Sequence, residues 1–478
     1  MKKLMILICC VSGIAFFSCR KNLTPLNIDP KNPTTVPSYT LFSKAQLNLA
    51  NQLATPNVNT GIFELLAQYW QEVTYTDESN YDLVTRAIPN NWFHGLYRDV
   101  LINLQQAKSL IPEDVSDAVQ QKNEIAMADI MQVYTWHYLV TTFGNIPYKE
   151  ALDINNTQPK YDDAKTIYAD LVSRLNTDIA NLNTSGDSFG SADLLYGGDV
   201  AKWKKFANSF KLKMGILMAD YDAAASKTAV ESAVTAGVFT SNSDNALFNF
   251  LDAPPNTNPI WVNLVQSGRK DFVACQTILN YMVPNNDPRL PLYFTKDATG
   301  TGYSGLPAGT GGSYAAKSKP ADQIVAPSFP YDFLDYAEVE FCLAEAVERG
   351  YAVTGTAAQH YNNAITASIT AWGGSAAAAA AYLAQPSVAY ATAAGNYKQK
   401  IGTQKWIALY NRGQDGWTEW RRLDYPVLPI ATQHITAVIP VRYTYPTTEQ
   451  NLNKSNWTSA SSAIGGDDVA TKLWFDKY

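Results

Sequence analysis

The chain has 478 residues, of which 46% are hydrophobic, and this is enough apolar material for a large core divided over two or three units. Its formal net charge is −6. A mildly acidic protein does not suit the phosphate backbone of nucleic acids, so the composition argues against DNA or RNA as a partner.

The N-terminus has the pattern of a bacterial lipoprotein signal. Lys2 and Lys3 precede an apolar run, 4–17, and Ser18 then stands directly before Cys19. The run is too short to span a bilayer comfortably. We predict a signal peptide over residues 1–18, a lipid on Cys19 and membrane attachment without a spanning segment. An ordinary secretory signal cut elsewhere is the alternative.

A polar segment follows the cysteine. Four prolines, at positions 25, 30, 33 and 37, prevent a continuous helix. We therefore predict an extended tether over residues 19–39 and a folded body over residues 40–478.

Helical patterns dominate residues 40–240 and 331–424. Met127, Ile130 and Tyr134 recur at helical spacing, and Gly144 is expected to end that helix. Asp199 has the position of an N-cap for the next apolar run. Small residues facing aromatic ones across consecutive helices predict pairs that pack like tetratricopeptide repeats, without a strict period.

Two segments interrupt the helical pattern. Residues 241–330 are rich in Asn, Pro, Gly and Asp, and residues 425–478 are also irregular in large part. Loops on a rigid scaffold commonly carry binding residues, so we assign the ligand-binding face to these segments.

Two cysteines, Cys275 and Cys342, remain in the folded body. One disulfide is arithmetically possible. Both lie in apolar, helix-like surroundings, which favours two separate buried thiols.

The sequence offers no recognisable catalytic or cofactor motif. The four histidines lie far apart, and no metal-binding spacing, nucleophile elbow or P-loop is present. Gly300–Gly305 matches GxGxxG, but Pro307 follows where a nucleotide site needs a helix. One predicted helix contains three carboxylates, Glu338, Glu340 and Glu345. Roles as surface charges or as hydrogen-bond partners at the core edge account for these carboxylates without a catalytic function. We predict no catalytic residues, no metal and no cofactor.

Nine short motifs in order resemble the SusD/RagB-like outer-membrane lipoproteins, in the SusD-like type 2 branch. They are LNIDP with Asn32-Pro33, FGNIPY at 143–148, DLLYGGD at 193–199 with Lys202-Trp203, NDPRLP at 286–291, YAEVEF at 336–341, TQKW at 403–406, EWRR at 419–422, IPVRY at 439–443 and GGDD at 465–468.

This resemblance implies a mainly α fold in which tetratricopeptide-like helix pairs support a loop-rich face. It implies a protein without catalytic activity that is lipid-anchored at the outer membrane. Such a protein binds a nutrient, usually a glycan and sometimes a peptide, and delivers it to a SusC-like TonB-dependent transporter. The resemblance implies that the protein faces the extracellular side as a surface lipoprotein. Arg20 and Lys21 stand where many surface-exported relatives carry acidic residues, so the periplasmic face is the alternative.

The ligand-contacting residues vary within the family, so we choose candidates by chemistry. A sugar offers a C–H face to aromatic rings and hydroxyls to Asn, Asp and Arg. These types gather in the predicted loops, and the candidates are Tyr75, Asp77, Asn80, Tyr81, Arg86, Trp261 and Tyr303, with Tyr314 as a weaker one. The alternatives are a helical scaffold that binds only proteins and a glycan hydrolase.

Overall fold

The structure, a computed structural model, describes residues 36–478, and residues 38–478 form one contact unit. The predicted signal peptide, Cys19 and nearly all of the predicted tether lie outside the described residues. The first described helix, α2, begins at Ser38, which is slightly before the predicted start of the body.

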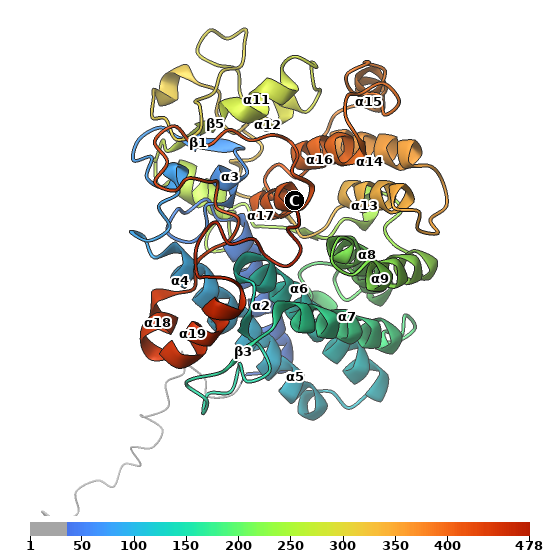
Figure 1. Cartoon of the computed structure of the whole chain (residues 1–478). Coiled ribbons are helices and arrows are strands. Elements are labelled where there is room, and N and C mark those ends of the chain that lie inside the picture. Colours follow the sequence, from blue (N-terminus) through green and yellow to red (C-terminus); the bar gives the residue numbers. More distant parts are fainter. Residues whose placement is uncertain (1–35) are drawn as a thin grey trace, which may run out of the picture. The chain divides into compact units, whose positions relative to one another are not determined.

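Helices are the main secondary structure of the described chain, as the sequence predicts (Figure 1). The N-terminal half contains α2 (Ser38–Ala54), α3 (Phe63–Leu66), α4 (Ile88–His94), α5 (Ile102–Asp114), α6 (Ala118–Phe143), α7 (Ala164–Asn181), α8 (Val200–Met218) and α9 (Ala223–Ala236). The remaining helices are α10 (Pro259–Trp261), α11 (Gln276–Met282), α12 (Leu290–Tyr293), α13 (Tyr336–Glu348), α14 (Ala357–Ala371), α15 (Ala376–Leu383), α16 (Tyr397–Ala408), α17 (Gly413–Leu423), α18 (Thr447–Leu452) and α19 (Lys454–Ala463).

Local sequence explains where the central helices start and stop. The Asp199 carboxylate accepts hydrogen bonds from the backbone N–H groups of Ala201 and Lys202, both at 3.0 Å, and so caps α8 as predicted. Helix α6 ends at Gly144, whose φ of +86° is available to glycine at little cost.

The strands are few and short. Three antiparallel two-stranded ribbons pair β1 (Trp70–Glu72) with β5 (Phe272–Ala274), β2 (Ile146–Pro147) with β3 (Tyr161–Asp162), and β4 (Leu247–Phe248) with β6 (Tyr331–Asp332). In the first ribbon Gln71 lies opposite Val273. The β1–β5 and β4–β6 ribbons join segments far apart in the sequence, whereas β2 and β3 are close neighbours.

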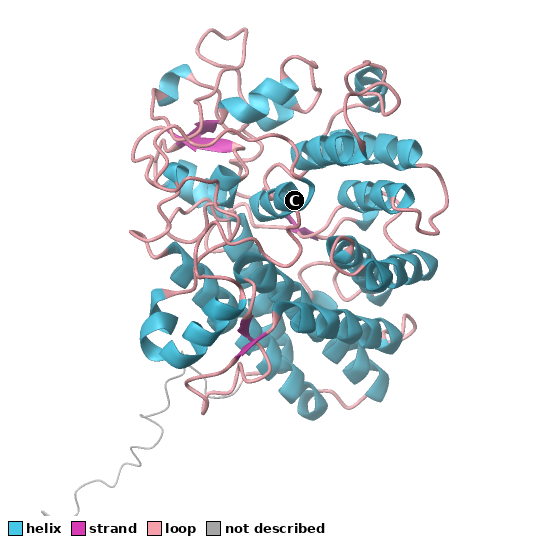
Figure 2. Ribbon diagram, in the orientation of Figure 1, coloured by secondary structure: helices cyan, strands magenta, loops and turns pink. Residues whose placement is uncertain are grey.

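Helices pack in consecutive pairs. The pairs α6/α7, α8/α9 and α13/α14 follow one another along one side, where α7 contacts α8 and α8 contacts α13 (Figure 1). Figure 2 shows that loops and short elements gather on the side where β1 and β5 pair. The predicted mainly α fold with tetratricopeptide-like pairs is confirmed.

The two cysteines of the folded body and several tryptophans lie in the core. Cys275 and Cys342 are both buried and free, as expected. Trp92, Trp406 and Trp417 lie in the core, each with 1% or less of its surface exposed. No helix among residues 36–478 has the length and hydropathy needed to cross a membrane.

A buried network of ion pairs ties α8, α13, α16 and α17 together. Arg422 donates to both oxygens of Glu345, at 2.5 and 2.6 Å. Lys213 contacts Glu338 at 3.0 Å and Asp415 at 2.7 Å. Such pairs stabilise a fold only when every charged member keeps its partner, because an unpaired buried charge is costly.

Two of the three carboxylates of α13 therefore differ from the expected role as surface or core-edge groups. Glu338 and Glu345 are neither surface charges nor at the core edge; they are fully buried ion-pair partners. Burial alone would raise the pKa of Glu345, but Arg422 and Arg349 hold it at about 2. Glu340 is 5% exposed and bonds to His360 at 2.6 Å.

Replacing Arg422 with methionine should lower the free energy of unfolding by about 3–5 kcal/mol, since Glu345 loses its bidentate partner in the core. Urea unfolding measures this change. The matched control is Lys227→Met, which breaks an exposed pair with Glu231 and should cost less than about 0.5 kcal/mol. Equal effects of the two substitutions would contradict the assigned role of the network.

Candidate functional site

Three loop segments meet on the loop-rich side, and we call them together the loop face: residues 73–87, 303–316 and 427–438. The Gly312 N–H donates to the Val73 carbonyl at 2.9 Å, which joins the first two segments. The Thr432 N–H donates to the Ala308 carbonyl at 2.9 Å, which joins the second and third. The face thus combines parts of the chain separated by more than 300 residues.

Asn80 is the residue that connects all three segments. Its amide nitrogen donates to the carbonyls of Thr76 at 2.8 Å and Gly309 at 2.9 Å. Its side-chain oxygen accepts from the Gln433 N–H at 3.0 Å. Both polar atoms are therefore engaged by the protein, and the residue is 4% exposed.

Tyr81 has a similar role. It is 3% exposed, and its hydroxyl accepts a hydrogen bond from the Ala431 N–H at 2.8 Å. Asn80 and Tyr81 thus shape the loop face from below instead of presenting their side chains to solvent. The sequence analysis proposed both as ligand contacts; in this conformation neither has a free polar atom at the surface.

Gly309 permits this close packing. Its φ is +77°, and a Cβ atom at this position would lie 2.3 Å from the Asn80 side-chain oxygen. Any larger residue would strain the backbone and displace Asn80 at once.

Carboxylates brace the first segment from within. Glu72 accepts from the Ser79 N–H at 2.9 Å and from the Ser79 hydroxyl at 2.6 Å. Arg86 forms an ion pair with Glu78. Burial raises the pKa of Glu72 to about 8, and the charge of Glu78 contributes in the same direction. Arg86 is thus engaged within the loop, although its side chain stays about one-third exposed.

Tyr75 and Asp77 are the sequence candidates that point outward on this face. Tyr75 is 74% exposed and has a φ of +57°, an unusual conformation for a large residue. Asp77 is also exposed. Backbone strain of this kind persists where the surroundings impose it, and it often marks a binding loop.

The loop face also carries exposed aliphatic side chains. They are Val84 in the first segment and Val427, Ile430, Ile435 and Val438 in the third, with exposures from 36% to 72%. The Ile435 N–H donates to the Asn80 carbonyl at 3.1 Å, so the third segment is held beside the first. The loop face therefore presents apolar side chains from two of its three segments.

Of the other candidates, Tyr303 and Tyr314 belong to the second segment of the loop face, and Trp261 lies outside it. Tyr303 is half-buried, and the Lys296 ammonium lies 4.9 Å from its ring centroid. Tyr314 packs against Val73 and Leu306 under the loop face. Trp261 ends α10 and is half-buried. Among the described residues, no hydrogen bond or ring contact joins Trp261 or Tyr303 to Tyr75.

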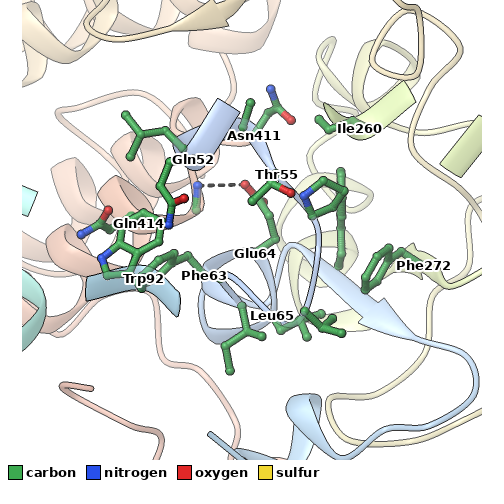
Figure 3. A pocket seen from close by; sticks show the side chains of 18 residues that line it. Gln52, Thr55, Phe63, Glu64, Leu65, Trp92, Ile260, Phe272, Asn411 and Gln414 are labelled. Atoms are coloured by element: carbon green, nitrogen blue, oxygen red, sulfur yellow. Dashed lines mark hydrogen bonds between the residues drawn. The ribbon is translucent and has the colours of Figure 1, made fainter. Parts of the chain in front are cut away.

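A small cavity lies between α2, α3 and the start of α17 (Figure 3). Glu64 accepts from the Gly413 N–H at 2.8 Å, and burial raises the pKa of Glu64 to about 8. The cavity holds about 20 Å³, which suits one water molecule and excludes a sugar ring. Three buried atoms of its lining, Gln52 Nε2, Trp92 Nε1 and Gln414 Oε1, have no hydrogen-bond partner in the protein.

The sequence analysis missed two contributors to the site. It placed a ligand segment at 425–478 but named no residue in it, because scattered Val and Ile residues carry no motif. It also missed the bridging role of Asn80 in the fold, since the partners of Asn80 lie 229 and 353 residues away.

The comparisons with known proteins agree with this architecture. A family model described as "Starch-binding associating with outer membrane" matches residues 30–446. The chain belongs to this SusD-like family, whose members bind carbohydrate and are not catalytic. The comparison with curated protein sequences gave no match.

Solved structures share the fold over nearly the whole chain. A protein titled as chitin-binding is 28% identical, with a TM-score of 0.80, over 92% of this chain and 100% of that one. A SusD homologue from Bacteroides uniformis is 26% identical, with a TM-score of 0.80 and coverages of 92% and 100%. A chitin-binding SusD homologue from Flavobacterium johnsoniae, 24% identical with a TM-score of 0.80, covers 92% and 98% and supports the fold alone.

The raised pKa of Glu72 predicts a pH-dependent loop. A protonated Glu72 favours the folded loop, so the stability of residues 73–87 should fall as the pH rises from the ordinary carboxyl range towards 8. Hydrogen-exchange protection factors, measured from pH 5 to pH 9, report this change. Glu72→Gln should remove most of the pH dependence.

The control for this prediction is Glu113→Gln, at an exposed position at the end of α5. It should leave the protection profile of residues 73–87 as in the parent protein. If the protection factors of Glu72→Gln and of the parent protein fall in parallel as the pH rises, a group other than Glu72 titrates.

Proposed function

We propose that this protein captures a neutral glycan on the loop face and delivers it to a SusC-like TonB-dependent transporter. The observation that carries the proposal is Tyr75, a ring 74% exposed and fixed in a left-handed backbone conformation. A ring with most of its surface exposed is available to stack on the C–H face of a sugar.

The charges of the loop face support a neutral ligand. Arg86 is paired with Glu78, and Asp77 adds a negative charge beside Tyr75. The face therefore has little free positive charge with which to hold an anionic polysaccharide. A peptide with an apolar side chain is the second candidate, favoured by the exposed aliphatic residues of the third segment.

The related protein at 28% identity suggests the first glycan to test, because it is named as chitin-binding. We infer that a β-linked N-acetylglucosamine oligosaccharide is a suitable ligand. Its C–H faces are apolar and suit the ring of Tyr75, and its hydroxyls are neutral, so they can donate to an acidic side chain such as Asp77.

Tyr75→Ala should weaken binding of chitotetraose by about five-fold, which corresponds to about 1 kcal/mol for one stacked ring. Isothermal titration calorimetry measures this change. Tyr39→Ala is the control, since Tyr39 is a 52% exposed tyrosine on α2, outside the loop face. Equal affinity of the two variants would remove Tyr75 from the site. Cellotetraose tests whether the acetamido group matters.

The same proposal assigns the exposed aliphatic residues to the transporter contact. Lipidation of Cys19 would hold the protein at the outer membrane. Tethering in the same membrane raises the effective concentration of the ligand carrier at its transporter partner. A weak contact of modest area is then sufficient to keep the protein at the transporter. Such a contact leaves the ligand free to move on into the transporter.

Ile435→Asp should reduce the amount of a TonB-dependent barrel that co-purifies with the tagged protein from mild-detergent extracts of outer membranes. A buried unpaired carboxylate opposes association strongly. Ile154→Asp is the matched control, because Ile154 is 92% exposed and lies outside the loop face. Mass spectrometry identifies the partner, and a protein recovered without any barrel would contradict the assignment.

A further inference from the structure

The His360 ring, in the first turn of α14, lies between two hydrogen-bond acceptors. Its Nδ1 is 2.6 Å from the Glu340 carboxylate of α13, and its Nε2 is 2.8 Å from the Thr354 carbonyl. Thr354 belongs to residues 349–356, which join α13 to α14 and which we call the 349–356 loop. One side chain thus connects a helix, the next helix and the loop between them.

This geometry fixes the protonation state of the ring. A neutral imidazole has one N–H and one lone pair, so it can donate to only one of two acceptors. The Thr354 carbonyl has no proton to give, so Nε2 must carry one. The Asn363 amide donates to the same Glu340 oxygen at 3.4 Å, and Tyr336 also bonds to this carboxylate, which favours its ionised form. Nδ1 must then carry a proton too, and the ring is an imidazolium.

The second proton of the ring depends on these two bonds. Burial disfavours a charged ring, and so does the helix dipole in the first turn of α14. The bonds to Glu340 and Thr354 nevertheless raise the pKa of His360 above its ordinary value of 6.5. The ring therefore loses its second proton above pH 6.5, within the range in which histidine acts as a pH sensor.

The other charged side chains on the neighbouring elements bond to partners away from this ring. Towards the end of α13 they are Glu345, Glu348 and Arg349, which bond to Arg422, Tyr390 and Asp220. On α9, α16 and the turn at 242–244 they are Lys227, Glu231, Lys398, Lys400 and Asp244, which bond to Glu231, the Ala352 N–H, Asp220, the Tyr390 carbonyl and Lys205. The ionisable groups that face His360 are thus Glu340 and, behind it, Tyr336.

The 349–356 loop also contacts the preceding helix pair. The Tyr351 hydroxyl donates to Ser226 at 2.8 Å, and the Ala352 N–H donates to Glu231 at 2.6 Å, both on α9. Gly355 has a φ of +96° and lies against the ring, where a Cβ atom would be 3.0 Å from His360 Nε2. The loop therefore joins the α8/α9 pair to the α13/α14 pair, and His360 holds its far end.

We propose that His360 is a pH-dependent clamp, which holds the 349–356 loop on α14 while its ring carries two protons and releases the Thr354 end of the loop when one is lost. The remaining proton stays on Nδ1, beside the negative charge of Glu340. Nε2 then turns a lone pair towards the Thr354 carbonyl, and the two repel each other. This inference is independent of the loop face and of the proposed function.

The sign of the pH dependence follows from the raised pKa. The clamp contributes its full stabilisation below pH 6.5, where the ring is protonated in the folded chain and in the unfolded chain. This contribution is lost as the pH rises through the raised pKa of His360. A more alkaline solution should therefore loosen the link between the two helix pairs.

The first test is NMR of the full chain labelled with ¹⁵N at its four histidines. The ring ¹⁵N shifts distinguish an imidazolium from each neutral tautomer, and the signal missing in His360→Gln assigns this ring. We expect a titration midpoint above 6.5 and loss of the proton from Nε2. His137 is the internal control, because burial lowers its pKa to about 3 and its ring should stay neutral. A midpoint at or below 6.5, or loss from Nδ1, would overturn the proposal.

The second test measures release of the loop by hydrogen exchange between pH 6 and pH 9. The protection factors of residues 350–356 should fall over the range in which His360 titrates. Glu340→Gln removes the negative charge, so it should move both the titration and the loss of protection to lower pH. His360→Gln has no titrating ring and should make the protection of the loop independent of pH.

His94→Gln is the matched control for the second test, since the His94 ring bonds to Thr448, outside this loop. It should leave the pH dependence of residues 350–356 as in the parent protein. Constant loop protection while His360 titrates would show that the ring does not hold the loop. An equal fall in the parent protein and in His360→Gln would assign the release to another group.

Discussion

The ion-pair network buried between α8, α13, α16 and α17 is the constraint on which the rest of the structure depends. Arg422, Glu345, Lys213 and Glu338 lie where a fold of this size would usually place aliphatic side chains. Each charge is acceptable there only while its partner is in place. The network therefore fixes the mutual position of helices that belong to different pairs.

The loop face uses that rigidity through α3 and α17. Arg412, at the N-terminal end of α17, pairs with Glu338 and Asp415 of the network. Glu64, in α3, accepts from the N-terminal N–H of α17, and β1 follows α3 into the loop segment at 73–87. A fixed scaffold lets the surface loops keep strained conformations such as that of Tyr75.

The loop face is built from three segments that only the tertiary structure brings together. Its exposed aromatic and aliphatic side chains are spread over these segments, which suits an extended chain or a protein surface.

The sequence by itself determined the helical scaffold, its caps at Asp199 and Gly144, the two free thiols and the family. These features depend on local patterns, because helical periodicity, capping and motif order are all contained in neighbouring residues. Tertiary structure alone decided which candidates face solvent. Tyr75 and Asn80 look alike as loop residues, but Asn80 is buried by partners hundreds of residues away. Long-range packing of this kind leaves no local pattern in the chain.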